Sequence, residues 1–513
     1  MSEQIATGWT SVPLEDIAEL VRGVTFPTTD KRHQPGDGLV ACLRTTNVQA
    51  AVEWTDLWFI PERHIKHPEQ LVRVDDVLIS TANSYELVGK VARVTTLPTR
   101  STLGAFISAL RARSGVKPKF LYYQLATAQI QQAIRDMSST TTNISNVSGA
   151  KLKQLPLKVA PTAEQARIVE KLEELLSDLD AGVAELKAAQ AKLQQYRQSL
   201  LKAAVEGALT QAWRESNPAP EETGADLLAR ILRERRARWE ARQLAKFEAQ
   251  GNTPPKGWQR KYSEPVAPAV GVSSLPITWT WATLDQLTEF ITSGSRGWAD
   301  YYSDSGATFI RSQDINRDQL DLTDCAHVQA PRGSEGQRTR VELDDLLLTI
   351  TGANVGKAAR VHIDLEEAYV SQHVALLRPV QRWTSQYLHL FLTATGGARG
   401  QLNKAAYGAG KPGLNLDQVG GVLVPLPPSA EAAALVASVT GAFAAVAIQE
   451  AAISASLRQS TAQRQNLLRA AFAGQLVPQD PADEPAAELL ARIRAERAQQ
   501  APVKRRGRRT ETA

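Results

Sequence analysis

The chain contains a long-range internal repeat, and this repeat limits its architecture more than any other feature. Residues 197–209 (RQSLLKAAVEGAL) return as residues 464–476 (RQNLLRAAFAGQL), at a shift of 267 residues. Residues 227–231 return in turn as residues 489–493. A solenoid unit spans about 20–50 residues, so this longer period indicates a duplicated domain followed by a duplicated helical segment. Two copies of one unit form a pseudo-dimer, which suits a target with two half-sites.

The size and composition are those of a large globular protein. A chain of 513 residues is expected to fold into about three or four domains. Its two cysteines, Cys42 and Cys325, fall at unmatched positions of the two copies and have neither metal-ligand nor disulfide spacing. We find no signal-peptide pattern and no apolar run approaching the roughly 18 residues of a membrane span. We therefore expect a cytoplasmic protein, and its net charge of +5 weakly favours a polyanionic partner.

Each copy has the pattern of a mixed globular part followed by long helix. Short apolar runs at residues 39–43 and 77–80, and at 308–310 and 346–350, predict strands separated by polar loops. The predicted fold class is α+β, with two homologous globular domains joined by two long antiparallel helices in a pseudo-two-fold arrangement. The expected boundaries are residues 1–160 for the first domain, 161–250 for a central helical region, 251–275 for a linker, 276–427 for the second domain, 428–498 for a C-terminal helical region and 499–513 for a basic disordered tail.

The first long helix is predicted from Thr162 to Leu209, which corresponds to about 70 Å. Thr162 is a candidate N-cap, and Gln165 completes a possible capping box. One such helix fits an ordinary bundle equally well, but two in a duplicated chain can join their heptad stripes as an antiparallel coiled coil. The predicted seam residues are Leu172, Leu179, Leu186, Leu193 and Leu200, and Val439, Val446, Ile453 and Leu467 in the second copy. A further helix near residues 226–248 interleaves Arg with Glu, which favours a solvated face over direct nucleic-acid contact.

We find no catalytic apparatus in the sequence. Residues 352–358 imitate a phosphate-binding loop but are one residue short and end in Ala, and residues 408–412 place Pro where Ser or Thr should stand. The seven histidines are scattered without metal-ligand spacing. The pairs Asp75-Asp76 and Asp344-Asp345 directly precede apolar runs, which favours turns over metal-binding carboxylates. We therefore expect a non-catalytic chain with no metal or cofactor of its own.

What remains is binding through side chains on polar loops. Arg, Asn, Gln and Lys are the residue types that read base edges or hold phosphates. Each such residue taken singly also fits an ordinary surface position, so the signal lies in their grouping on loops of a duplicated domain. The candidate DNA-binding residues are Arg44, Asn83, Tyr85, Lys90, Arg311, Gln313, Asn354, Lys357, Gln372, His373, Lys404, Tyr407 and Lys411.

Several segments together resemble the specificity subunit of Type I restriction–modification enzymes. Residues 279–284 (TrpThrTrpAlaThrLeu) are similar to the domain-opening pattern of that family, and residues 9–14 are their partner. Residues 309–315 followed by 351–357 resemble a common type of target-recognition domain. Further similarity lies in the proline-rich entries to the spacer helices and in the closing segment, at residues 160–165, 427–431 and 474–493. The resemblance covers nearly the whole chain and rests on the order and duplication of the motifs. The first domain departs from it at residues 84–88, where the second copy is shorter.

The resemblance implies a division of labour that accounts for the missing chemistry. In this family the specificity subunit reads a split, asymmetric site in double-stranded DNA. Two modification subunits methylate adenine with S-adenosylmethionine, and restriction subunits use ATP and magnesium to translocate and cleave. The two helices would act as a ruler and dock the partner subunits. The alternatives are a stand-alone DNA-binding scaffold or repressor, and a DNA-modifying enzyme with an unrecognised motif.

Overall fold

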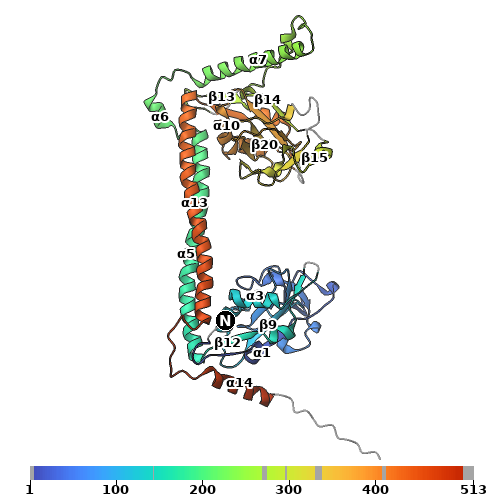
Figure 1. Cartoon of the computed structure of the whole chain (residues 1–513), viewed down its shortest axis with the longest axis vertical. Coiled ribbons are helices and arrows are strands. Elements are labelled where there is room, and N and C mark those ends of the chain that lie inside the picture. Colours follow the sequence, from blue (N-terminus) through green and yellow to red (C-terminus); the bar gives the residue numbers. More distant parts are fainter. Residues whose placement is uncertain are drawn as a thin grey trace, which may run out of the picture. The chain divides into compact units, whose positions relative to one another are not determined.

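The computed structural model of the chain describes residues 5–141, 144–268, 274–294, 297–329, 338–406 and 412–500. The described chain forms two compact units, and each unit combines one globular domain with segments of both long helices (Figure 1). Unit 1 comprises Met1–Lys187 and Ser454–Ala513, and unit 2 comprises Ala188–Ile453. Each unit is described separately below.

The globular domain of unit 1 is built on short, largely antiparallel sheets. Its main sheet has the strand order β2-β9-β5-β7, beside which lie the sheets β4-β3-β8, β10-β11-β6 and β1-β12. The strands are β1 (Thr10–Pro13), β2 (Ala18–Arg22), β3 (Leu39–Leu43), β4 (Trp58–Pro61), β5 (Val77–Ser80), β6 (Ala82–Asn83), β7 (Val91–Arg93), β8 (Ser101–Leu103), β9 (Ile107–Ala112), β10 (Ser139–Thr141), β11 (Ile144–Asn146) and β12 (Pro156–Val159). The helices are α1 (Leu14–Ile17), α2 (Pro118–Leu125), α3 (Ala128–Asp136) and α4 (Gly149–Lys153). All four residues of β5 are buried, as expected for a central strand.

The domain of unit 2 repeats this plan. Its main sheet has the order β14-β23-β20-β21, and a second sheet has the order β15-β19-β16-β22. The strands are β13 (Thr280–Thr283), β14 (Thr288–Ser293), β15 (Tyr302–Ser303), β16 (Ala307–Ile310), β17 (Ile315–Asn316), β18 (Gln319–Leu320), β19 (Ala326–Val328), β20 (Leu346–Thr349), β21 (Ala358–Arg360), β22 (Ala368–Val370), β23 (Val374–Pro379) and β24 (Leu423–Leu426). The helices are α8 (Leu284–Leu287), α10 (Thr384–Thr393), α11 (Ala398–Ala405) and α12 (Leu416–Gly420).

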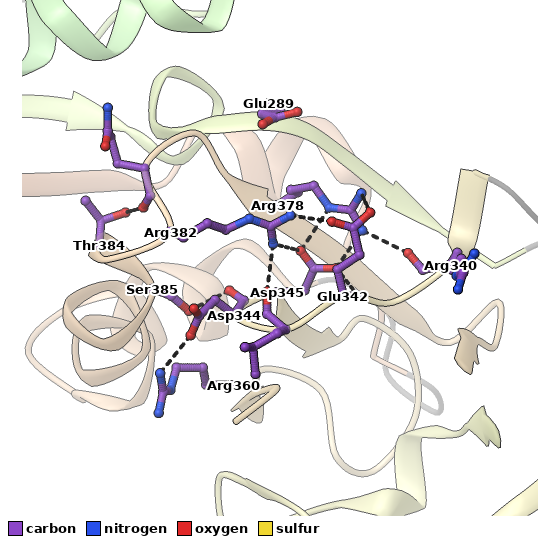
Figure 2. A network of polar contacts seen from close by, with 12 residues as sticks. Glu289, Arg340, Glu342, Asp344, Asp345, Arg360, Arg378, Arg382, Thr384 and Ser385 are labelled. Carbon is purple, nitrogen blue, oxygen red and sulfur yellow. Dashed lines mark hydrogen bonds and ion pairs between the residues drawn. The ribbon is translucent and has the colours of Figure 1, made fainter. Parts of the chain in front are cut away.

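The two aspartate pairs form turns that lead into the central strands, as the sequence predicted. Asp75 and Asp344 adopt left-handed backbone angles, with φ of 71° and 69°. The aspartates that follow them, Asp76 and Asp345, are buried. Asp345 accepts hydrogen bonds from Arg378 on β23 and from Arg382, which follows that strand (Figure 2). The carboxylates of Asp76 and Asp345 therefore pair with arginines of their own domains.

The long helices α5 (Thr162–Val205) and α13 (Ser429–Phe472) pack against each other in antiparallel fashion. In unit 1 the beginning of α5 packs on the end of α13, where Leu172 lies in one apolar cluster with Leu468. In unit 2 the end of α5 packs on the beginning of α13, where Leu200 and Val439 share a cluster. The ion pairs Arg464–Asp180 in unit 1 and Arg197–Glu450 in unit 2 join the same two helices. The predicted α+β class with two globular domains and two long packed helices is confirmed.

The predicted seam residues differ in their burial. Leu172, Leu200, Val439 and Val446 are buried. The other five are half-buried, namely Leu179, Leu186, Leu193, Ile453 and Leu467. In a pair of helices each seam residue is covered by one partner helix only. Part of its side chain therefore stays open to solvent.

Two local expectations for the first helix were wrong. The helix ends at Val205 and not at Leu209, because Gly207 turns the chain with a φ of 74° and its carbonyl accepts a hydrogen bond from Arg214. Thr162 and Gln165 do not form a capping box. The Thr162 hydroxyl donates to the Gly115 carbonyl, and the Gln165 side chain bonds to backbone groups outside the helix.

Each repeated closing helix packs on the domain of the other copy. Helix α7 (Gly224–Ala249) follows the first domain in sequence but buries Leu227 and Ile231 in the core of unit 2. Helix α14 (Ala486–Gln500) follows the second domain but buries Leu489 and Ile493 in the core of unit 1. The two helices start with the same contact: the Gly224 N–H donates to Thr278 O at 2.8 Å, and the Ala486 N–H donates to Gly8 O at 2.9 Å. A third helix, α6 (Gln211–Ser216), lies between α5 and α7.

Helix α13 is the one described helix whose composition resembles that of a membrane span. This helix contains an 18-residue window with a mean hydropathy of 1.8, which passes the test of length and composition for a membrane span. Its small residues and sparse charge produce this value, which a search for runs of large apolar residues overlooks. Because α13 packs on α5 and on the cores of both units, it is a core helix of the fold.

Candidate nucleic-acid interface

Three chain segments meet at one end of the main sheet in each domain. In the first domain the Thr81 N–H donates to Phe106 O at 2.8 Å, and the Thr81 carbonyl accepts from the Val147 N–H at 2.9 Å. In the second domain the Ile350 N–H donates to His373 O at 2.9 Å, and the Ile350 carbonyl accepts from the Leu414 N–H at 2.9 Å. We call these meeting segments the loop edge. It comprises residues 81–90, 104–107 and 144–147 in the first domain and residues 350–357, 371–374 and 412–415 in the second.

The loop edge of the first domain brings together three predicted DNA-binding residues. Asn83 ends β6, and its Oδ1 accepts from the Ser84 N–H at 2.9 Å. Tyr85 follows, with 43% of its surface exposed. Lys90 donates from Nζ to Gln49 Oε1, which ties the edge to the loop after β3. All three therefore belong to one short stretch of the loop edge, residues 83–90.

The loop edge of the second domain brings together four predicted residues. Asn354 donates from Nδ2 to Ser312 O at 3.3 Å, which ties the edge to the loop after β16. Lys357 is half-buried at the end of the same turn. Gln372 and His373 are exposed and lie within hydrogen-bond distance of each other, at 3.2 Å. Both domains thus present polar side chains on a scaffold of the same backbone hydrogen bonds.

The two predicted arginines stand at equivalent positions and take part in internal ion pairs. Arg44 pairs with Asp56 and lies over the Trp58 ring, with its guanidinium carbon 4.7 Å from the ring centre. Arg311 donates from Nε and Nη2 to Asp314 at 3.1 and 2.9 Å. The hydrogen bond to Asp314 raises the pKa of Arg311 above its ordinary value. Both arginines therefore stiffen the loop that precedes the loop edge, and their role in DNA binding stays a prediction.

The remaining predicted residues are not part of either loop edge. Gln313 is exposed on the short 3₁₀ turn Ser312–Asp314, beside the loop edge of the second domain. Lys404 is exposed on α11, whose residue Asn403 approaches Gly356. Tyr407 and Lys411 lie outside the described residues.

A tight turn crosses the loop edge in both domains, and sequence reasoning overlooked it in the first. The Ile107 N–H donates to Gly104 O at 3.0 Å, and the Val374 N–H donates to Ser371 O at 3.0 Å. The tip residues are Ala105 and Phe106 in one turn and Gln372 and His373 in the other. Phe106 was missed because the candidates were chosen among polar side chains on polar loops. The shift of 267 residues, which aligns Phe106 with His373, could have revealed it.

Two titratable groups with shifted pKa values, Cys42 and His389, lie inside the domains. Burial raises the pKa of the Cys42 thiol to about 12, so this cysteine is an inert core residue at neutral pH. Burial lowers the pKa of His389, whose Nε2 lies 3.0 Å from Asp318 O. Within the described residues, no three His, Cys, Asp or Glu side chains are grouped so as to hold a metal ion. The loop edges of the two domains offer hydrogen-bonding groups and apolar side chains, which suit the binding of another molecule.

Comparisons with known proteins agree with this picture. Residues 6–188 match a family model described as the Type I restriction modification DNA specificity domain. The chain is 25% identical over 518 residues to the Type I restriction enzyme EcoKI specificity subunit of Escherichia coli (strain K12), covering 96% of this chain and 97% of that one. It is also 25% identical over 512 residues to the StySPI specificity subunit of Salmonella potsdam, covering 96% of each. A solved structure from a study of complex assembly in a type I R-M system aligns with a TM-score of 0.63 at 17% identity, covering 92% of this chain and 99% of that chain. The last likeness concerns the fold alone.

Proposed function

The chain belongs to the specificity subunits of Type I restriction–modification enzymes, and we propose that each of its two domains reads one half of a bipartite, asymmetric DNA site. The observation that carries this proposal is the repeated loop edge. In both domains the same backbone hydrogen bonds hold it, whereas its side chains differ. One scaffold with two sets of side chains is suited to reading two different half-sites.

The same proposal gives the helices α5 and α13 two tasks. They set the gap between the half-sites, and they dock two modification subunits, which methylate adenine with S-adenosylmethionine. The exposed face of α13 supports docking, because an apolar helix exposing residues such as Ile448, at 72%, favours burial against a partner. Restriction subunits would add ATP- and magnesium-dependent translocation and cleavage. In this proposal the complex works in the cytoplasm, where its double-stranded DNA target is found.

The proposal is tested by producing the chain in a methylation-free host together with the modification subunit encoded beside it. Sequencing of methylated adenines should reveal one bipartite, asymmetric motif that is absent when the chain is left out. An unchanged methylation pattern would contradict the proposal. Methylation or cleavage of DNA by the purified chain alone would instead support an enzyme.

A second measurement concerns binding. The purified chain should bind DNA weakly and without sequence preference, and it should gain selectivity when the modification subunit is added. Affinity should fall steeply with salt in either state, because phosphate contacts release counterions. Tight, selective binding by the chain alone would favour a stand-alone repressor.

A further inference from the structure

The turn at residues 104–107 is held by backbone hydrogen bonds and presents an exposed aromatic ring. Its backbone is fixed on three sides: the Gly104 N–H donates to Leu43 O at 2.9 Å, Phe106 O accepts from Thr81, and Ile107 closes the turn. The neighbouring backbone is close enough that a Cβ on Gly23 would lie 2.1 Å from Gly104 O. Despite this order, Phe106 exposes 62% of its surface, more than any other Phe, Trp or Tyr in the described ranges.

The second domain has the equivalent turn at residues 371–374, with different side chains at its tip. The Ser371 N–H donates to Ile310 O at 2.9 Å, as Gly104 does to Leu43, and Gly294 makes the matching close approach to Val370 O. Its tip presents Gln372 and His373, which are exposed and polar. The duplicated chain has therefore kept the backbone of this turn and changed what it presents. This is expected of a position that determines specificity and not of one that maintains the fold.

We propose that this turn is a base-reading element in both domains and that Phe106 selects a thymine by contact with its 5-methyl group. The inference rests on the proposed function and names a specificity residue for it. A phenyl ring offers no hydrogen bond to a base edge, and the thymine methyl is the apolar group that the major groove displays. Gln372 and His373 can instead donate and accept hydrogen bonds, so the second domain reads a different base with the equivalent turn.

The surroundings of Phe106 fit a mixed polar and apolar contact with DNA. Asn83 lies on the strand that follows Thr81, the residue whose N–H holds the Phe106 carbonyl. Strand β6 pairs with β11, so that Asn83 lies opposite Ser145. Ile144, next to Ser145, exposes 54% of its surface. Ser145 itself is buried and bonds to the Thr140 hydroxyl at 2.8 Å, so the groups left for DNA are the half-buried Asn83 amide and the exposed Ile144 side chain, one polar and one apolar.

The experiment uses the complex of the whole chain with its modification subunit and a duplex carrying the site found by methylation sequencing. Each thymine of the site is replaced in turn by deoxyuridine, which lacks only the methyl group. At one position the wild-type complex should lose affinity roughly fourfold, the value of one buried methyl-sized group. The Phe106→Ala complex should bind thymine DNA as weakly as uracil DNA at that position. His373→Ala, in the equivalent turn, and Leu87→Ala, on the same loop edge, should retain the wild-type difference.

Other outcomes would overturn the inference. Equal losses on thymine and uracil DNA for Phe106→Ala would make the ring a wedge between base pairs. Reduced assembly with the modification subunit, at unchanged discrimination, would make it a protein contact. A site without thymine, or uracil sensitivity that survives Phe106→Ala, would also exclude the thymine contact. In all these cases the bipartite motif persists, whereas failure of the proposed function would remove the motif itself. Because Phe106 is exposed, thermal unfolding of the variant should match that of the wild type.

Discussion

At the scale of single residues, some side chains that recur in both copies stabilise the fold and do not belong to the candidate site. Arg111 and Arg378 recur at the repeat shift, and each forms an ion pair with a buried aspartate that follows a turn. Arg111 donates from Nε and Nη2 to both oxygens of Asp76 at 2.8 Å. Asp345 has two such partners, Arg378 and Arg382 (Figure 2). At the position equivalent to Arg382 the first domain has Gly115.

This difference predicts unequal effects of removing the repeated arginine. Arg111→Ala should destabilise unit 1 by about 3–5 kcal/mol, because Asp76 would stay buried without a cationic partner. Arg378→Ala should destabilise unit 2 by only about 1–3 kcal/mol, since Arg382 still pairs with Asp345. Urea unfolding with hydrogen exchange resolved by peptide measures each unit in the intact chain. An equal or larger loss for Arg378→Ala would show that Arg382 does not compensate.

A second pair of equivalent residues has diverged in its charge environment. Glu431 accepts from Trp279 Nε1 at 2.8 Å, from Thr210 at 2.6 Å and from Arg214 at 2.5 Å. Glu164 accepts from Trp9 Nε1 at 3.0 Å, but its Oε1 is buried without a hydrogen-bond partner in the described part of the chain. Burial raises the pKa of Glu164 above its ordinary value of 4.5.

The raised pKa gives stability a pH dependence that Glu164→Gln should remove. A group whose pKa is raised by folding contributes stability that is present below its ordinary pKa and is lost as the pH rises through the raised value. The variant should therefore match the wild type in acid and be the more stable of the two at neutral pH. Hydrogen exchange at the start of α5, followed across this pH range, measures the difference. A wild type that is more stable than the variant at neutral pH would contradict it.

The matched substitution Glu431→Gln should have the opposite effect at neutral pH. It leaves Arg214 without its carboxylate partner, so unit 2 should lose about 3 kcal/mol. The same hydrogen-exchange measurement, read at the start of α13, provides the control.

At the scale of elements, the sequence predicted the helices well and their ends less well. The seven-residue recurrence of leucines identified a face of α5 on which Leu172 and Leu200 are buried. It did not predict the end at Val205, because Ala208 and Leu209 continue the apolar pattern and only the backbone angle of Gly207 interrupts the helix. In the candidate site, residue type correctly placed Gln372 and His373 on an exposed turn. Residue type could not show that Arg44 and Arg311 have acidic partners, because Asp56 and Asp314 become neighbours only in the folded loops.

Shortening both long helices tests the proposed ruler. One heptad is removed from each of α5 and α13, between the ion pairs Asp180–Arg464 and Arg197–Glu450. Seven residues correspond to about 10 Å of helix, or about three base pairs. The methylated motif should keep both half-sites, and its gap should shrink by that amount, because a whole heptad preserves the apolar seam. Removing four residues instead rotates the seam and should weaken assembly. An unchanged gap in the heptad variant would exclude the helices as the ruler.

At the scale of the whole molecule, the exchange of closing helices joins the two copies into one structure. The repeat revealed two copies of the helix that begins at residues 224 and 486, but it could not show which domain each helix completes. Both copies carry the same apolar face, so periodicity fits either pairing. The choice is made by contacts distant in sequence, such as Ala486 on Gly8 and Gly224 on Thr278. Neither half of the chain therefore holds a complete domain core by itself.

The same two-domain plan predicts that equivalent lysines act on different half-sites. Lys90→Ala should weaken recognition of one half-site and Lys357→Ala that of the other, since each lysine belongs to the loop edge of its own domain. Loss of a base contact costs about 1–3 kcal/mol and relaxes one position, whereas loss of a phosphate contact weakens all sequences alike. Lys90 also donates to Gln49, so Gln49→Ala serves as a control for disturbance of the loop. Footprints of the assembled complex on DNA with either half-site scrambled distinguish these effects. If both lysine variants disturbed the same half-site, one domain could not correspond to one half-site, and the duplication would need another explanation.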